Sequence, residues 1–181
     1  MKNVKFLLSA ALVFLASAAL AQDFSGPQYA KWGATPEERE QNILNSNFLK
    51  ESCDNRDYDA AAHYLKGLID KIPDAAESIY LRGTTLYKNK INRAKSVAEK
   101  NMFIDSLMLM YDMRAQYFGD NVKPGKTAFI LDQKAREFLR YKPNDRKGIR
   151  EAFRAAIAQG GDSTVPETVV AYFSNLCEDY K

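Results

Sequence analysis

The sequence KPGKT at residues 123–127 is the stretch most similar to a catalytic motif, because Gly-Lys-Thr ends the phosphate-binding loop of many nucleotide-binding proteins. That loop places four residues between its first glycine and the Gly-Lys-Thr. Here five residues separate Gly119 from Gly125, and a helix rather than a strand is expected before them. We therefore interpret the stretch as an ordinary turn and predict no nucleotide site.

The other groups that could do chemistry are too few to form a site. His63 is the only histidine, and no further ligands accompany it at helical spacing, so we expect it on the protein surface. A serine nucleophile would have only this histidine as its base. The chain has no Cys-x-x-Cys-His for haem attachment, and the methionines of segment 94–118 are typical core residues. The sequence predicts no catalytic residue, no metal site and no bound cofactor.

Basic residues are concentrated in segment 123–154, which has ten lysines and arginines against four acidic residues. Arginines four residues apart share a helix face, and such a face either contacts an acidic partner or anionic envelope polymer, or is solvated. Exposed tyrosines could also anchor a peptide, with half-buried packing as their alternative. The candidate partner-binding residues are Tyr64, Tyr87, Arg136, Arg140, Arg150 and Arg154.

The N-terminus has the pattern of a secretory signal peptide. Lys2 and Lys5 precede the apolar run 6–20, and Ala19 and Ala21 form a cleavage site of the Ala-x-Ala type, so we expect cleavage after Ala21. The run is shorter than the roughly 20 residues that a membrane span needs. We predict a periplasmic or secreted protein with no membrane span after cleavage.

The remaining 160 residues are sufficient for one domain with a substantial core. Without Lys2 and Lys5 the chain has 24 basic and 23 acidic residues, a net charge of +1, and this balance gives no reason to expect nucleic acid. Cys53 and Cys177 lie near opposite ends of the mature chain. In an elongated array they would be too far apart for a disulfide, which needs α-carbons within about 7 Å.

Apolar residues recur at helical spacing through most of the mature chain, and no segment alternates as a strand does. Residues 22–34 are expected to be an extended lead-in. Thr35, Pro36 and Glu38 then form an N-cap, a first-turn proline and a capping box. The expected helices span residues 35–53, 57–72, 75–89 and 94–118, followed by three more that end near 141, 159 and 181. The fold class is all-α with seven helices, and the last helix is expected to bury Val169, Val170, Phe173, Leu176, Cys177 and Tyr180.

Segment 57–87 contains two of these helices, and Pro73 separates them. Ala61 is followed by Leu65 four residues later, by Pro73 twelve later and by Gly83 twenty-two later. This spacing resembles the tetratricopeptide repeat (TPR), with the small residues allowing helices to approach closely. The resemblance is to the exported TPR proteins of Bacteroidetes-type bacteria, and it implies a right-handed α-α superhelix of helical hairpins over residues 35–181.

The resemblance covers residues 42–90 best. Leu49 stands where the family has a small residue, and Leu68 where it has an alanine. If Ala135 is the next equivalent of Gly83, the spacing is 52 rather than 34 residues. The last helix ends without a cap, so either it packs as a terminal cap or the repeat domain continues beyond Lys181, which we favour.

The function that these features predict is a non-enzymatic, monomeric scaffold that binds a protein or peptide partner in the cell envelope. The alternative is the N-terminal part of a larger envelope enzyme or cofactor-binding protein whose active residues lie outside this chain.

Overall fold

The computed structural model describes residues 23–178, and within this range the protein is all-α, as predicted. The predicted signal peptide and Tyr180 lie outside the described residues. Seven α-helices and two short 3-10 helices (η) are present, and the described residues include no strand. In order, they are η1 (Pro27–Trp32), α1 (Pro36–Asp54), α2 (Tyr58–Lys71), α3 (Glu77–Arg93), α4 (Val97–Phe118), α5 (Lys126–Tyr141), α6 (Arg146–Gly160), η2 (Gly161–Ser163) and α7 (Pro166–Cys177).

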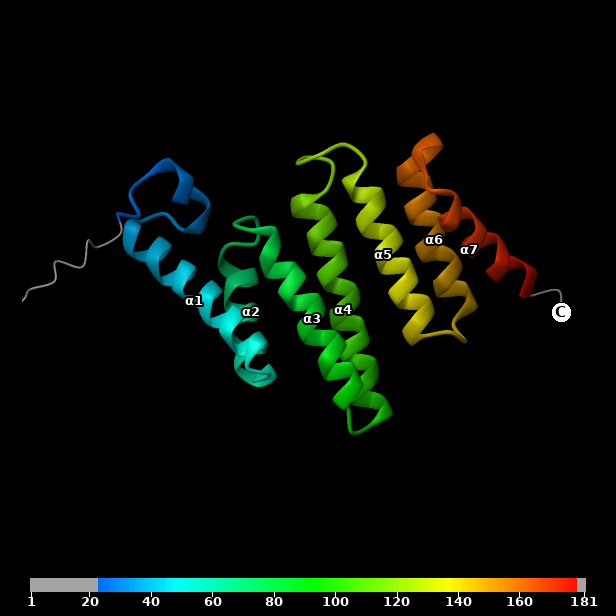
Figure 1. Ribbon diagram of the computed structural model, residues 1–181, viewed down its shortest axis with the longest axis horizontal. Helices are drawn as coiled ribbons and strands as arrows, with labels where there is room; N and C mark the ends of the chain where they lie inside the picture. The colour runs from blue at the N-terminus through cyan, green and yellow to red at the C-terminus, as the bar shows by residue number, and fades with distance from the viewer. Residues whose placement is uncertain (1–22, 179–181) are drawn as a thin grey trace, which may run out of the picture.

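The seven α-helices follow one another along the long axis of the molecule in the order of the sequence, and each helix runs across that axis (Figure 1). Each packs against the next one in the chain, and α1 also contacts α3. Lys88 of α3 pairs with Glu137 of α5 at 2.6 Å, and the Thr168 hydroxyl of α7 donates to Asp132 of α5 at 2.6 Å. The odd-numbered helices are therefore linked to one another along the array.

Local sequence signals set the helix boundaries. The capping box of α1 is formed, because Thr35 Oγ1 accepts a hydrogen bond from the Glu38 amide and Glu38 Oε2 accepts one from the Thr35 amide. Asp57 caps α2 by accepting from the Ala60 amide at 3.1 Å. This helix ends at Lys71, and Ile72 is its C-cap directly before Pro73, where the sequence predicts the break.

The lead-in is not extended throughout, which corrects our expectation for residues 22–34. Gly26 is extended, but Pro27 starts the 3-10 helix η1, which packs on α1. Tertiary hydrogen bonds from α1 shape this segment. The side-chain amide of Asn42 donates to the Trp32 carbonyl at 2.7 Å, and the Arg39 guanidinium donates to the Phe24 and Gly33 carbonyls. These bonds hold the segment against α1.

The core is a series of three apolar clusters that follow the helix order: α1–α4, α3–α5 and α5–α7. Ala61, Leu65 and Gly83, three of the predicted repeat-packing residues, are buried in or beside the first cluster. A β-carbon on Gly83 would lie 2.6 Å from Met110 Sδ and 3.2 Å from Leu65 Cδ2. Gly83 thus stands at the meeting point of α2, α3 and α4, where only glycine fits without displacement. Pro73 is half-buried, and its carbonyl accepts a bond from the Tyr80 hydroxyl at 2.7 Å.

The predicted buried face of the last helix is wrong. Val169, Val170, Phe173 and Cys177 are exposed, with Phe173 at 64%, whereas Leu176 is half-buried. The buried residue of α7 is Thr168 instead. Helix α7 packs on α6 with one face, and among the described residues no later helix covers the other.

Cys53 and Cys177 are free thiols in α1 and α7, at the two ends of the array, as their separation predicts (Figure 1). Among residues 23–178, no helix has the combination of length and apolarity that a membrane span requires. Within the same range, no cluster of three or more His, Cys, Asp or Glu side chains could hold a metal ion.

Candidate functional site

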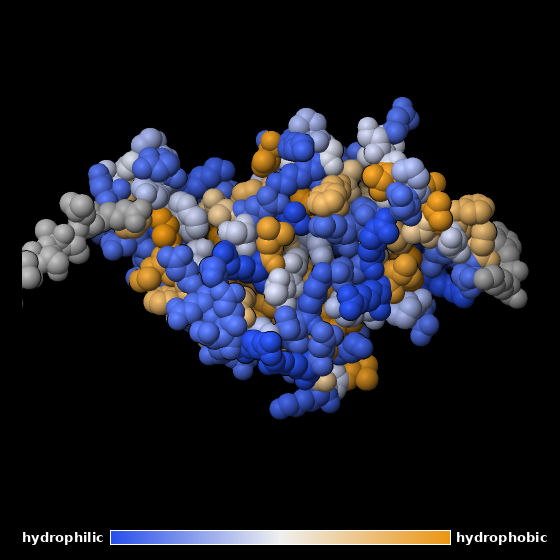
Figure 2. Space-filling model, in the orientation of Figure 1, coloured by the Kyte–Doolittle hydropathy of each residue, from blue (hydrophilic) through white to orange (hydrophobic). Residues whose placement is uncertain are grey.

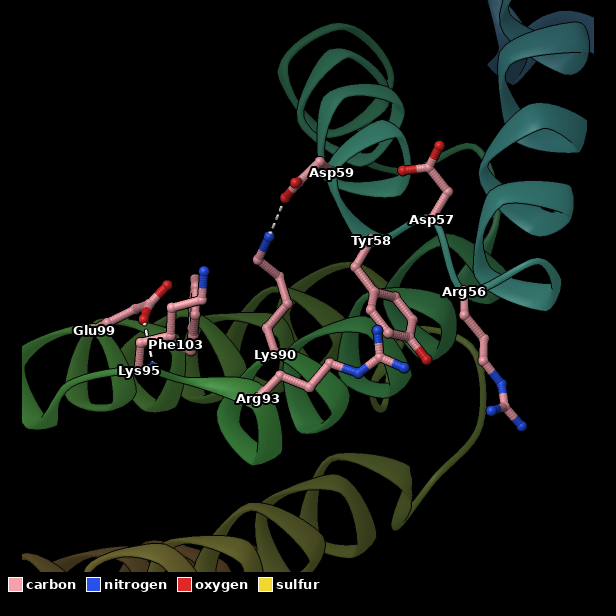
Figure 3. A pocket seen from close by; sticks show the side chains of 9 residues that line it. All are labelled: Arg56, Asp57, Tyr58, Asp59, Lys90, Arg93, Lys95, Glu99 and Phe103. Atoms are coloured by element: carbon pink, nitrogen blue, oxygen red, sulfur yellow. Dashed lines mark hydrogen bonds and ion pairs between the residues drawn. The ribbon is translucent and has the colours of Figure 1, made fainter.

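A hollow of about 310 Å³ opens where the start of α2, the end of α3 and the start of α4 meet (Figure 3). Charged residues dominate its lining, and two aromatic rings are also part of it. The lining residues are Arg56, Asp57, Tyr58, Asp59, Lys90, Arg93, Lys95, Glu99 and Phe103. We call it the α2–α4 hollow.

The sequence places these residues through helix spacing. Lys90 and Arg93 are three residues apart in the last turn of α3 and therefore project from neighbouring positions. Glu99 and Phe103 are four residues apart and share one face at the start of α4, and Lys95 lies in the turn before this helix. A turn of only three residues joins the two helices, and it brings both sets of side chains to the same edge of the array.

A positively charged side chain of α3 lies over each of these two aromatic rings. The Arg93 guanidinium lies 4.6 Å from the centre of the Tyr58 ring of α2, and Lys90 Nζ lies 5.1 Å from the centre of the Phe103 ring of α4. Both rings are buried. Because the rings come from different helices, the two cation–π contacts fix the end of α3 between α2 and α4.

Each carboxylate that lines the hollow already accepts a hydrogen bond from another group of the protein. Asp57 caps α2, Glu99 Oε2 accepts from the Lys95 amide at 2.7 Å, and Asp59 accepts from Lys90 at 2.7 Å. The hydrogen bond from Lys90, with its positive charge, holds the pKa of Asp59 below its usual value. The side chains of Arg93 and Lys95, in contrast, form no ion pair within the described part of the chain.

Arg136 and Arg140, two of the sequence-predicted anchors, are both exposed on α5. Arg136 Nε donates to Asp132 at 2.8 Å, and the Arg140 guanidinium lies 5.4 Å from the centre of the Tyr141 ring. The hydrogen bond to Asp132 is the main cause that raises the pKa of Arg136. The prediction that these two arginines share a face is confirmed by their four-residue separation in one continuous helix.

The other predicted anchors are spread over the molecule. Arg150 and Arg154 lie on α6, where Arg154 Nη2 donates to the Tyr172 hydroxyl of α7 at 3.2 Å. Tyr64 packs beside Phe48 of α1, with ring centres 5.4 Å apart. Tyr87 is half-buried between the first two core clusters. The structure therefore does not bring all six residues into one site.

Two further surface residues of α5, Phe129 and Leu139, are not among the residues that the sequence predicted as anchors. Phe129 is 56% exposed, and Leu139 is also exposed. Phe129, Arg136 and Arg140 are separated by seven and by four residues, and these helical intervals could have shown that the three side chains share one face of the helix. We call the exposed residues Phe129, Arg136, Leu139 and Arg140 the α5 stripe.

Two hollows flank Phe129. One of about 100 Å³ lies between α5 and the η2–α7 segment and includes Asp132, Val165 and Thr168. The other, of about 400 Å³, is lined by the preceding turn from Lys123 to Lys126. The phenyl ring thus stands between two depressions that a partner's side chains could enter.

The KPGKT turn does not present its lysine for phosphate binding. Lys126 Nζ donates to Glu77 of α3 at 2.6 Å, and Glu77 also pairs with Arg114. Thr127 and Asp120 exchange two hydrogen bonds of 2.9 Å each, which close the loop. The turn connects α4 to α5 and ties both to α3.

Comparison of the chain with protein-family models, with curated proteins and with solved structures found no match.

Proposed function

We propose that this protein is a non-enzymatic TPR-like scaffold of the cell envelope, exported through a signal peptide at residues 1–21, that binds a protein or peptide along the α5 stripe. The series of helices, each packed on the next, supports a repeat architecture. The right-handed superhelix and the bacterial envelope are parts of this proposal.

The α5 stripe is the observation that carries the proposal. Its helix buries Ile130 and Ala135 on one side and exposes a phenyl ring, a leucine and two guanidinium groups on the other. Aromatic and arginine side chains are the residue types that contribute most to binding at protein interfaces. Covering Phe129 would remove apolar surface from water, at about 25 cal/mol for each Å².

The stripe also determines the chemistry of the partner. Arg136 is already paired with Asp132, whereas Arg140 contacts only an aromatic ring among the interactions of the described residues. A carboxylate of the partner would therefore bind Arg140 first. Eleven residues of α5 separate Arg140 from Phe129, a distance of about 16 Å along the helix, so a second, apolar side chain farther along the partner would enter one of the hollows beside Phe129. The surface visible in Figure 2 is largely hydrophilic, with small, separate hydrophobic patches, so a single apolar anchor suits it better than a broad apolar interface.

The experiment is a pull-down from the native envelope fraction with residues 22–181 immobilised. The variants Phe129→Ala and Arg140→Glu test the stripe, and Lys147→Glu is the control, because Lys147 lies on α6 and is 83% exposed. We expect the wild type and the control to retain the same proteins, and each stripe variant to retain them at least about tenfold less, a change of ~1.4 kcal/mol.

Circular dichroism of each variant checks that the helices are intact. Equal retention by the stripe variants would refute the α5 stripe as the binding surface. A coloured or metal-loaded preparation would contradict the non-enzymatic scaffold itself.

A further inference from the structure

We propose that the α2–α4 hollow binds an oxyanion, a carboxylate or phosphate group, through the unpaired side-chain donors of Arg93 and Lys95. This inference does not depend on the proposed function, because the hollow is formed by α2, α3 and α4 and shares no residue with the α5 stripe.

The positive and negative side chains that line the hollow are unequally paired. All three carboxylates accept hydrogen bonds from groups of the protein, as described above. Of the cations, only Lys90 is paired with a carboxylate. Arg93 and Lys95 are left with eight N–H donors between them and no carboxylate within the described residues. The lining has four cations against three carboxylates, and Arg93 and Lys95 keep unpaired donors, so the hollow suits an anionic ligand better than a cation.

The Arg93 side chain is held in place by an aromatic ring. Its guanidinium lies over the buried Tyr58 ring at 4.6 Å, which removes water from one face of the group and leaves its N–H edges free. A guanidinium edge binds the two oxygens of a carboxylate or phosphate in a bidentate arrangement. Because the ring already restricts the side chain, less conformational entropy is lost on binding.

The second cation, Lys95, precedes α4 and lines the same hollow. In Figure 3 its side chain lies beside Phe103, on the other side of Lys90 from the Arg93 guanidinium, and Lys90 adds a further positive charge from within its pair with Asp59. Arg56 extends away from Arg93 at the rim, so we assign it no contact with the ligand. The starts of α2 and α4, whose backbone dipoles favour negative charge, both border the hollow.

The volume of about 310 Å³ accommodates an oxyanion together with part of the molecule that carries it. Carboxylate and phosphate share the same donor requirements, so the hollow itself does not distinguish them. The binding test therefore uses one probe of each kind.

The test is a titration of ¹⁵N-labelled residues 22–181 with inorganic phosphate and, separately, with succinate, at constant ionic strength set by chloride. We expect saturable changes in the amide signals of residues 57–59 and 94–99 with at least one probe. Saturation by phosphate alone supports a phosphate ligand, by succinate alone a carboxylate ligand, and by both an oxyanion site of broad selectivity.

The variants Arg93→Gln and Lys95→Gln are each expected to weaken this binding about tenfold. Lys95→Gln keeps the test valid if Arg93→Gln perturbs the fold, because the Lys95 side chain forms no ion pair or hydrogen bond among the described residues. Lys66→Gln, on the exposed face of α2 and paired only with Asp70, is the matched control and should bind like the wild type. The absence of saturable changes at this hollow with both probes, or equal binding by the two variants and the control, would overturn the proposal.

Discussion

The substitution Gly83→Ala tests the helix crossing at the centre of the array. In the structure, the added β-carbon would lie 2.6 Å from Met110 Sδ and 3.2 Å from Leu65 Cδ2, roughly 1 Å closer to the sulfur than an ordinary contact. Met110 is only 3% exposed, so its side chain has little room to move away. Overpacking of this kind costs about 1–3 kcal/mol in the free energy of unfolding.

Alanine also has a higher helix propensity than glycine, by about 1 kcal/mol, which opposes the overpacking. Gly67→Ala is therefore the matched control. Gly67 is also in the middle of a helix, but a β-carbon there would meet no atom within 4 Å. The propensity gain is common to both variants, so the difference between them isolates the overpacking. We expect Gly67→Ala to stabilise the protein by up to about 1 kcal/mol and Gly83→Ala to be less stable than it by about 1–3 kcal/mol.

Thermal and urea unfolding followed by circular dichroism measure this difference. For a domain of this size, 1 kcal/mol corresponds to about 2–4 °C in Tm. Gly83→Leu extends the series and should lose about 3 kcal/mol or more, because it adds further carbons to a site that already overpacks. If Gly83→Ala stabilised the protein as much as Gly67→Ala does, the close contact of α3 with Met110 would be refuted.

Two further predictions concern ion pairs and capping. Burial raises the pKa of Glu77, but hydrogen bonds and charges from Lys126 and Arg114 outweigh this effect and hold the pKa below 4.5. The stabilisation of the folded state by the ionised Glu77 carboxylate is therefore complete above about pH 4.5, and it is lost as the pH falls through the folded-state pKa of Glu77. The wild type should thus lose more stability than Glu77→Gln between about pH 5 and about pH 3. Parallel pH profiles in urea unfolding would contradict this. Thr35→Ala removes the N-cap of α1 and should cost about 1 kcal/mol, whereas Thr85→Ala, at an exposed mid-helix position, should cost nothing; equal Tm values for the two would argue against the capping box.

The candidate site could be predicted only in part from the sequence. Arg136 and Arg140 were found because four-residue spacing is a local property of a helix. Phe129 was missed because an apolar side chain near a helix start is compatible with either face until the neighbours are known. Arg93 gave no signal, because its contact with Tyr58 joins residues 35 positions apart in the sequence.

Local chemistry in the sequence determined the helices of this protein and the break at Pro73, because capping bonds, proline geometry and apolar spacing act within a few residues. The spacing of Ala61, Leu65 and Gly83 also predicted a close helix crossing, since small residues are needed wherever backbones approach. Only the tertiary structure decided which apolar faces are covered. The lead-in folds because Arg39 and Asn42 bind its carbonyls, and α7 exposes Phe173 because burial depends on a neighbouring helix that the sequence of α7 cannot specify.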